Sequence, residues 1–378
     1  MTITYLKLYY KLKKAQRYFH SEGMGKMNYY NKVIKDDLEM MSKEKIDFSA
    51  LKDKKILITG ANGMLATYFV YFLMYLNDNK NMNIKIYALS RNEEKLNERF
   101  IISNRKDIVP IIQDVGEPIN ITEKLDYIVH MASSANPKNI IDDPIGIIKA
   151  NIMGTFNVLE LARENNSEVI FTSTREIYGK MPDNIDFIKE TDMGALNCFD
   201  GRACYPESKR MAETILVNYY LQYNVKFKNL RIAHSYGPGM NIDNDGRIMS
   251  DLISDVVNKR DIILKSTGEA KRAFCYITDA ILAIFYVMIN GKVCESYNIA
   301  NETEEIKIKD LAELIAEIYI NNNVKVKFEI SQDTRAYTNF KRVGLDTTKL
   351  EKLGWVPKIK LKEGIKKTVD SFINNSEV

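Results

Sequence analysis

The sequence predicts an α/β protein built on a doubly wound parallel sheet, followed by a smaller mixed α/β lobe. Two observations predict this fold. From Lys54 onward, short β-branched runs alternate with helical patterns, and this alternation requires right-handed crossovers and a parallel sheet with both faces covered. In addition, a glycine turn joins the first run to a long apolar helix, as expected at the first crossover of such a sheet.

The elements are expected in the following order. The predicted strands span residues 54–60, 84–90, 108–113, 126–132, 167–174 and 225–233, and a helical pattern covers 151–165. The apolar stretch from Met64 to Leu76 is shorter than the roughly 18 residues that cross a bilayer, so we interpret it as a buried helix. We expect three parts: a helical extension over 1–50, a nucleotide-binding domain over 51–235, and a second lobe over 236–378 that is partly interleaved with the first.

Composition excludes several classes of protein. The 54 basic residues nearly balance the 50 acidic ones, which argues against a nucleic-acid-binding protein. The four cysteines have no metal-ligand or CxxC spacing, so reduced thiols, no metal site and a cytoplasmic location are expected. No signal peptide or membrane span is predicted. The segment up to His20 is basic and amphipathic, and the sequence leaves open a solvated helix, an oligomer contact or a membrane-surface helix.

The first chemical motif is the turn from Thr59 to Ala66, between a strand and a helix. Gly60 permits the tight turn, Gly63 lets backbone amides approach a pyrophosphate, and the helix N-terminus adds a positive dipole end. Asn62 and Met64 lie in the same turn. We predict a dinucleotide site here, and a structural turn without a ligand is the alternative.

The end of the second strand usually distinguishes NAD from NADP, because an acid there binds the ribose 2′-hydroxyl and an arginine accommodates a 2′-phosphate. This chain has Ser90 and Arg91 at that place and no acid. Both cofactors therefore remain open. Asp114 and Val115 follow the third strand and are placed to contact the adenine, although an aspartate is also an ordinary turn residue.

The second motif is Tyr205-Pro206-Glu207-Ser208-Lys209. Residues four apart share one face of a helix, so Tyr205 and Lys209 should point the same way. A neighbouring ammonium and a cationic nicotinamide would lower the pKa of the phenol and let Tyr205 act as a base. The strand over 167–174 ends nearby, where Thr174 would hydrogen-bond the substrate hydroxyl. Glu176 is either an acid or base at the neighbouring carbon or a structural partner of Arg175.

Taken together, the chain resembles the extended short-chain dehydrogenase/reductases that modify sugar nucleotides. The resemblance runs from about residue 54 to the end. It rests on TGANGMLA (59–66), HMAS (130–133), STREIYG (173–179), YPESK (205–209), RIAHSYGPG (231–239) and LGWVPK (353–358). Within that family, 202–214, 240–253 and 271–280 are most similar to the UDP-glucuronate decarboxylases.

The resemblance implies a Rossmann-type domain, bound NAD that is recycled, a UDP-sugar substrate and a homodimer formed by paired helices. It implies that Tyr205 is the base and Lys209 its partner, and that Thr174 and Glu176 complete the catalytic group. Ala132 would border the cofactor. The residues expected to contact the substrate are Arg175, His234, Arg247, Arg272 and Arg342, since guanidinium groups suit a diphosphate.

Three departures from the family pattern are notable. The acid after the second strand is missing, His234 stands where the family usually has Asn, and Arg175 replaces the Ser of decarboxylases and the Asp of 4,6-dehydratases. An arginine is a poor proton donor, which weakens the dehydratase reading. Arg175 instead suits the carboxylate of a uronic acid, unless it pairs with a surface acid such as Glu164.

We therefore expect a nucleotide-sugar enzyme that oxidises C4 of the sugar, with decarboxylation of UDP-glucuronate as the leading reaction. The alternative is 4- or 5-epimerisation, and a 4,6-dehydratase is less favoured. A nucleotide-binding protein without turnover is the remote alternative, and the presence of both Tyr205 and Lys209 argues against it.

Overall fold

A computed structural model describes residues 28–243, 245–319, 323–330 and 343–373. Seven parallel strands form the central sheet in the order β12-β7-β5-β4-β1-β2-β3. Their bounds are β1 Lys55–Thr59, β2 Lys85–Ser90, β3 Ile108–Ile112, β4 Tyr127–His130, β5 Glu168–Thr174, β7 Phe227–Ile232 and β12 Glu295–Ile299. The doubly wound parallel sheet predicted from the sequence is confirmed.

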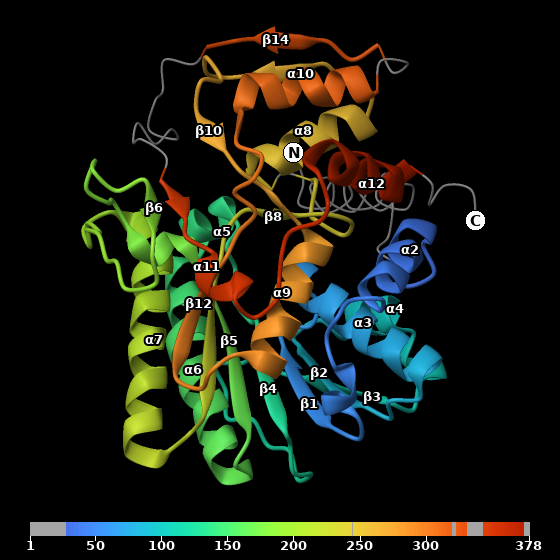
Figure 1. Cartoon of the computed structure of the whole chain (residues 1–378), viewed down its shortest axis with the longest axis vertical. Coiled ribbons are helices and arrows are strands. Elements are labelled where there is room, and N and C mark those ends of the chain that lie inside the picture. Colours follow the sequence, from blue (N-terminus) through green and yellow to red (C-terminus); the bar gives the residue numbers. More distant parts are fainter. Residues whose placement is uncertain (1–27, 244, 320–322, 331–342, 374–378) are drawn as a thin grey trace, which may run out of the picture.

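Helices cover both faces of this sheet (Figure 1). Alternate side chains of β1 face opposite sides, so Ile56 and Ile58 join one core and Leu57 joins the other. The first core includes α3 (Met64–Lys80), α4 (Glu93–Phe100) and α9 (Ile277–Asn290). The second core lies under α6 (Pro144–Asn165) and α7 (Cys204–Tyr223), which pack along each other.

All six predicted strands and the buried helix after the glycine turn are present. The seventh strand, β12, was not predicted; it lies beside β7 although it comes from the second half of the chain. By length and composition α6 resembles a membrane-crossing helix. Its inner face, however, buries Val158, Leu159 and Leu161 in the core beneath the sheet.

The second lobe lies over one end of the sheet (Figure 1). Its helices are α8 (Ile248–Val257), α10 (Ile308–Ile318) and α12 (Leu361–Ile373). Short strand pairs connect them: β8 (Ser235–Tyr236) with β11 (Cys275–Tyr276), β9 (Ile262–Leu264) with β14 (Val326–Phe328), and β10 (Lys271–Arg272) with β13 (Ile306–Lys307).

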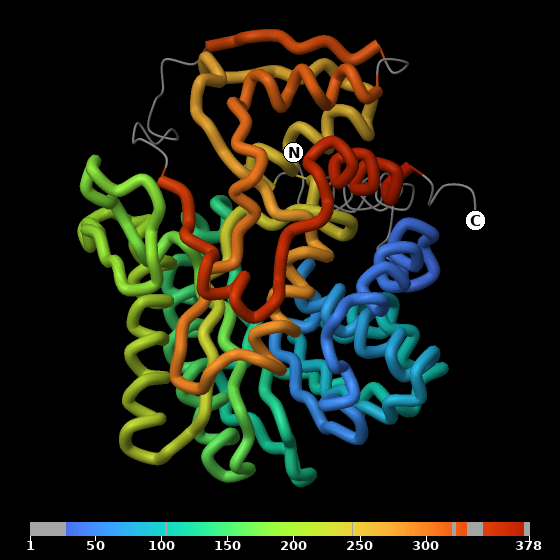
Figure 2. The backbone as a smooth tube through the Cα atoms, in the orientation of Figure 1, coloured from blue at the N-terminus to red at the C-terminus, as the bar shows by residue number. Residues whose placement is uncertain are grey.

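The C-terminal segment returns to the first domain before it enters α12. Figure 2 shows this segment in red, running down beside α9 and back up to α12. Within it, β15 (Gly344–Leu345) pairs with β6 (Phe187–Ile188), and α11 (Thr348–Glu351) contacts β12. The buried indole of Trp355 donates to the backbone oxygen of Asp279 at 2.9 Å. The two parts of the chain are therefore joined by more than the connection near residue 235.

The described part of the N-terminal segment packs into the main core. It contains α2 (Lys32–Met41) and a 3₁₀ turn, η1 (Phe48–Leu51). Asp37 of α2 is fully buried and accepts hydrogen bonds from Tyr68 at 2.9 Å and Tyr276 at 2.7 Å. Its other oxygen pairs with Lys367 of α12 at 2.8 Å. One carboxylate thus links α2 to three distant elements, while the predicted helix up to His20 lies outside the described residues.

Candidate active site

The glycine turn after β1 fits closely against the end of β4. Gly60 has a φ of +68°, and a Cβ atom there would lie 2.7 Å from the Cα of Ala132, so any side chain would both strain and displace the turn. Gly63 is the N-cap of α3, and no side chain caps that end of the helix. The arrangement leaves a helix N-terminus facing outward next to a backbone that can be approached closely, which fits a pyrophosphate.

A buried histidine braces the floor of this turn. The Nδ1 of His130 lies 2.7 Å from the hydroxyl of Thr59, which accepts bonds from the amides of Met131 and Ala132 at 3.2 Å each. The Thr59 hydroxyl must therefore donate to His130. Burial, followed by repulsion from Lys209, lowers the pKa of His130 to about 3, so this side chain stays neutral. The HMAS segment was predicted as a family motif, but the role of its histidine was not.

The end of β2 holds the residues that would meet the adenosine ribose. The amide nitrogen of Asn62 donates to the hydroxyl of Ser90 at 2.5 Å. Arg91 is exposed and forms an ion pair with Asp114 at 3.3 Å. Val115 is buried against α6. Its side chain packs so close to Gly154 that a Cβ atom on that glycine would lie 2.9 Å from it. The structure thus brings the predicted cofactor residues together along the edge formed by β1, β2 and β3.

Tyr205 lies in the first turn of α7 and is almost fully buried. Its hydroxyl is hydrogen-bonded to the side chain of Thr174, the last residue of β5. Burial and then the charge of Glu176 raise the pKa of Tyr205 well above its usual range, whereas Thr174 and Arg247 lower it. Among the protein groups alone, desolvation outweighs the cations around this phenol and keeps it protonated. The predicted fall in its pKa depends also on a bound cationic nicotinamide and stays a prediction.

Lys209 lies one turn further along α7, as the spacing predicted. It is 2% exposed, and its ammonium donates to the backbone oxygen of Thr172 at 2.8 Å and lies over the ring of Phe171. Burial lowers the pKa of Lys209 to about 7, against the opposing effect of Glu213. The position of this cation is fixed by β5, and its charge is adjustable near neutral pH.

Glu176 lies just past the end of β5, between two cations. Part of its side chain is accessible to solvent. Loss of hydration among the surrounding protein atoms raises the pKa of Glu176, and the charges of Arg202 and then Arg175 partly offset that rise. Arg175 donates to the backbone oxygen of Val343 at 3.1 Å, rather than serving only as a partner for Glu176. The sequence reasoning missed Arg202, although it lies only three residues before the Tyr205 motif.

Of the remaining predicted substrate residues, His234 precedes the second lobe, and Arg247 and Arg272 lie within it. Arg247 forms two bonds to the buried carboxylate of Asp245, one of them at 2.9 Å. Arg272 is half-buried in β10, and His234 lies just before β8 with a φ of +37°. Asn and His both tolerate this backbone region better than most residues, which accounts for a His where the family has Asn. Arg342 lies outside the described residues.

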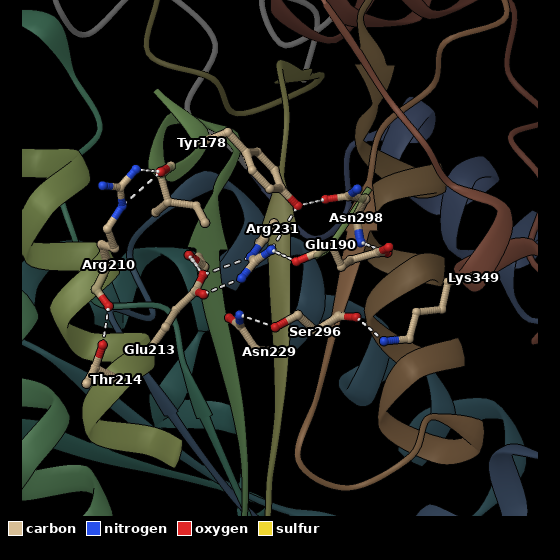
Figure 3. A network of polar contacts seen from close by, with 12 residues as sticks. Tyr178, Glu190, Arg210, Glu213, Thr214, Asn229, Arg231, Ser296, Asn298 and Lys349 are labelled. Carbon is tan, nitrogen blue, oxygen red and sulfur yellow. Dashed lines mark hydrogen bonds and ion pairs between the residues drawn. The ribbon is translucent and has the colours of Figure 1, made fainter. Parts of the chain in front are cut away.

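A network of polar contacts connects α7 to the neighbouring strands β5, β7 and β12 (Figure 3). Arg231 of β7 binds Glu213 of α7 at 2.7 and 3.1 Å, and it also donates to the hydroxyl of Tyr178 at 3.0 Å. That hydroxyl donates to Asn298 of β12 at 2.5 Å, and Ser173 of β5 donates to Glu213 at 2.5 Å. These bonds tie α7 to three adjacent strands and so fix the position of Tyr205 and Thr174.

Within the described residues, no group of three or more His, Cys, Asp or Glu side chains is arranged to hold a metal ion. The side chains gathered at the strand ends include a phenol, a lysine, a threonine and a carboxyl group beside the glycine turn. Fold and site together define a dinucleotide-binding protein of the doubly wound class with a Tyr-Lys pair.

Comparison with known proteins identifies the family. Residues 56–300 match the model of the NAD dependent epimerase/dehydratase family. UDP-glucuronic acid decarboxylase 3 of Arabidopsis thaliana is 32% identical over 318 residues, which cover 84% of this chain and 89% of the relative. UDP-glucuronic acid decarboxylase 1 of Xenopus tropicalis is also 32% identical, over 86% of this chain and 74% of the relative. The chain belongs to the NAD dependent epimerase/dehydratase family, and the resemblance inferred from its motifs is confirmed.

Solved structures agree on the fold. UDP-glucose 4-epimerase of Thermotoga maritima superimposes with a TM-score of 0.72 at 22% identity, over 85% of this chain and 100% of the other. A UDP-N-acetylglucosamine 4-epimerase of Methanobrevibacter ruminantium gives 0.72 at 23% identity, over 86% and 99%.

Proposed function

We propose that this protein is a nucleotide-sugar enzyme that decarboxylates UDP-glucuronate after oxidising C4 of the sugar. The observation that carries the proposal is the grouping of Tyr205, Thr174 and Glu176 at the end of β5, with Arg175 and Arg202 beside the carboxyl group. The similarity to UDP-glucuronic acid decarboxylases over most of the chain supports the same substrate.

Tyr205 accepts the proton of the sugar 4-hydroxyl, and Thr174 holds both oxygens in line. A nicotinamide dinucleotide, when bound, would supply the hydride acceptor and a positive charge that favours the phenolate. Lys209, held by the Thr172 carbonyl, contributes a second positive charge whenever it is protonated. Gly60 and Gly63 would hold the pyrophosphate of the cofactor at the N-terminus of α3.

A ketone at C4 makes the bond between C5 and the carboxylate labile, because the electron pair left by carbon dioxide is delocalised into the ketone. The carbanion at C5 must then be protonated. Glu176 suits this step, since a carboxyl group with a raised pKa holds a proton that it can donate. Arg175 would bind the carboxylate before it leaves.

Incubation with UDP-glucuronate tests the proposal by two products: released carbon dioxide, and a UDP-pentose or its 4-keto form detected by mass spectrometry. Tyr205→Phe should abolish both. Tyr220→Phe is the matched control, because Tyr220 lies on the same helix and its ring packs against Phe227. A changed stereocentre without gas release would instead assign 4- or 5-epimerisation, the second candidate reaction.

The role of Arg175 can be separated from that of the fold by comparing substrates. Arg175→Ala should raise the Michaelis constant for UDP-glucuronate. The dissociation constant of UDP-glucose, which has no carboxylate, should stay almost unchanged. Arg175→Lys keeps the charge but not the planar fork and should lie between the two. Equal effects on charged and neutral sugars would remove the carboxylate role and leave Arg175 as a structural partner of Val343.

We further propose that the protein is a cytoplasmic homodimer that pairs through α6 and α7. Their outer faces expose large apolar side chains: Ile145, Met153 and Phe156 on α6, and Met211, Val217 and Leu221 on α7. An apolar surface of this kind on two adjacent helices marks an association site. Light scattering should give twice the chain mass, and Leu221→Glu should give a monomer. A monomeric parent protein would refute the proposal.

A further inference from the structure

The N-terminal segment 28–51 lies between the two parts of the molecule and precedes residues 56–300, which match the family model. Figure 1 shows α2 of this segment between α3 of the first domain and α12 of the second lobe, and α2 contacts both helices. Its buried side chains Ile34, Leu38 and Met41 join the core to which α3 and α12 also contribute. The segment is therefore placed to fix one part of the molecule against the other.

Asp37 is the polar centre of this junction and is fully buried. One of its carboxylate oxygens accepts from the hydroxyls of Tyr68 and Tyr276, and the other accepts from the ammonium of Lys367. Tyr68 belongs to α3 of the first domain, whereas Tyr276 ends β11 and Lys367 lies on α12. One buried acid thus receives bonds from the first domain and from two elements of the second lobe.

Two further bonds at the start of the segment repeat this pattern. The hydroxyl of Tyr29 donates to Asp78 of α3 at 2.9 Å. The side-chain amide of Asn31 donates to the backbone oxygen of Ser371 in α12 at 3.2 Å. The segment is therefore bonded to α3 on one side and to α12 on the other at more than one point.

The elements that Asp37 holds are close to the two described arginines predicted to bind the substrate. Arg272 of β10 precedes Tyr276 by four residues, and Arg247 is the N-cap of α8, which packs against α12. The packing around α12 is tight, because a Cβ atom on Gly364 would lie 2.2 Å from the hydroxyl of Tyr236 and 2.9 Å from the ring of Tyr276. A shift of α12 or β11 is therefore transmitted to the backbone that carries both arginines.

We propose that α2 is a positioning element for the substrate, which acts through Asp37 to hold the second lobe where Arg247 and Arg272 bind the diphosphate of the sugar nucleotide. The inference rests on the proposed function in taking a sugar nucleotide as the ligand of this lobe. Asp37 acts only through other residues. When a binding arrangement is present for only part of the time, the apparent affinity falls by that fraction, so loosening the junction weakens substrate binding.

Calorimetry with UDP and with NAD⁺ tests the two parts of the molecule separately on nucleotide-free protein. Asp37→Asn keeps the size of the side chain but removes the charge and one acceptor oxygen. It should raise the dissociation constant of UDP by about three- to tenfold and leave that of NAD⁺, which the glycine turn would bind, unchanged. Asp36→Asn, at an exposed position of the same helix, is the matched control and should change neither. Folded Asp37→Asn protein that binds UDP as tightly as the parent would overturn the proposal.

Two variants reach the same junction from the second lobe and decide the matter if Asp37→Asn does not fold. Lys367→Met and Tyr276→Phe each remove one partner of Asp37, and each should weaken UDP binding by about two- to fivefold. Lys367→Arg keeps the charge and should recover most of the affinity. Lys366→Met is the control, because Lys366 pairs with Asp370 of its own helix. Parent-like UDP binding by both Lys367→Met and Tyr276→Phe would contradict the assignment.

Amide hydrogen exchange tests the junction without any ligand. In Asp37→Asn protein, the amides of β11, α8 and α12 should exchange faster than in the parent, because local opening follows the loss of local contacts. The amides of β1, β4 and β5 should exchange as before. A uniform rise in both parts of the molecule would show that Asp37 supports the whole fold and does not position the lobe.

The inference and the proposed function fail separately. A parent protein that binds UDP but leaves UDP-glucuronate unchanged would refute the reaction, and the UDP affinities of the variants would still decide the role of Asp37. A protein that decarboxylates UDP-glucuronate with the same Michaelis constant in the parent and in Asp37→Asn would refute only the positioning role.

Discussion

Helix α7 carries two ionisable side chains one turn apart, the buried Lys209 and the largely buried Glu213, and their surroundings differ. Glu213 meets the guanidinium of Arg231 through two bonds and the hydroxyl of Ser173 through a third. Lys209 meets one backbone oxygen, that of Thr172, and its pKa falls to about 7. A charge paired with an opposite charge is fixed, and a charge that faces only a carbonyl can change with its surroundings.

On this one helix, Glu213 belongs to a structural network, whereas Lys209 lies among the residues proposed for the reaction. The Glu213 network joins α7 to β5, β7 and β12, while the residues around Lys209 face the strand ends where a ligand would lie. Buried polar groups that are fully paired stabilise one arrangement. Perturbed groups that lack such partners are typical of reaction sites. Four predictions test this division.

The largest effect is expected at the reaction site itself. Tyr205→Phe removes only a hydroxyl, so turnover should fall by about 10²- to 10⁴-fold, while the free energy of unfolding should change by less than about 1 kcal/mol. Steady-state kinetics and denaturant unfolding of the same preparation measure both. A Tyr205→Phe protein that unfolds much more easily would show that the hydroxyl is structural, and the division would fail.

The supporting network should respond in the opposite way. Glu213→Ala leaves Arg231 buried without its partner and should lower the free energy of unfolding by about 3–5 kcal/mol. Glu207→Ala is the matched control on the same helix, because Glu207 is more exposed and lies 4.0 Å from Arg210; about 0–1 kcal/mol is expected there.

Replacing both partners, as Glu213→Leu with Arg231→Met, should recover part of the loss, since no unpaired charge remains. A double variant as unstable as the sum of the two single ones would show that the side chains act independently.

Sequence reasoning predicted more residues of the candidate reaction site than of the supporting network around Glu213. The six strands from 54–60 to 225–233 could be predicted from local sequence, because each is a short apolar run beside a turn. A parallel sheet then brings the ends of these strands together. The spacing of four predicted that Tyr205 and Lys209 share a face. The threonine at the end of β5 followed from the same geometry.

What could not be predicted depends on contacts between distant segments. β12 has a mixed pattern, and only its bonds to β7 identify it as the seventh strand. Arg231 was part of a family motif, but its partner Glu213 lies on another element. Asp37 showed no signal, since a single acid in a polar segment is ordinarily exposed. The rise in the pKa of Tyr205 caused by its burial was not predicted either, because the degree of burial is a property of the whole fold.

Asp37 extends the comparison to the N-terminal segment, which precedes the residues matched by the family model. Like Glu213 it is buried and fully bonded, to Tyr68, Tyr276 and Lys367. Asp37→Ala should therefore lower the free energy of unfolding by about 2–4 kcal/mol. Asp36→Ala, at an exposed position of α2, should have little effect. Equal results for the two would mean that α2 does not brace the core.

The smallest effect is a pH dependence, and it tests the adjustable charge directly. Burial lowers the pKa of Lys209 from 10.5 to about 7. Between these values the unfolded chain binds a proton that the folded protein does not. The contribution of Lys209 to stability must therefore rise with pH across this window, by at most about 1.4 kcal/mol per pH unit.

Below about pH 7 both states are protonated and the full cost of the buried charge applies. Unfolding curves of nucleotide-free protein at several pH values should therefore show this rise in the parent and in Lys226→Met, an exposed control, but not in Lys209→Met. A Lys209→Met protein with an unchanged pH slope would mean that the ammonium is permanently charged in the fold. Lys209 would then belong with Glu213, as part of the structural support.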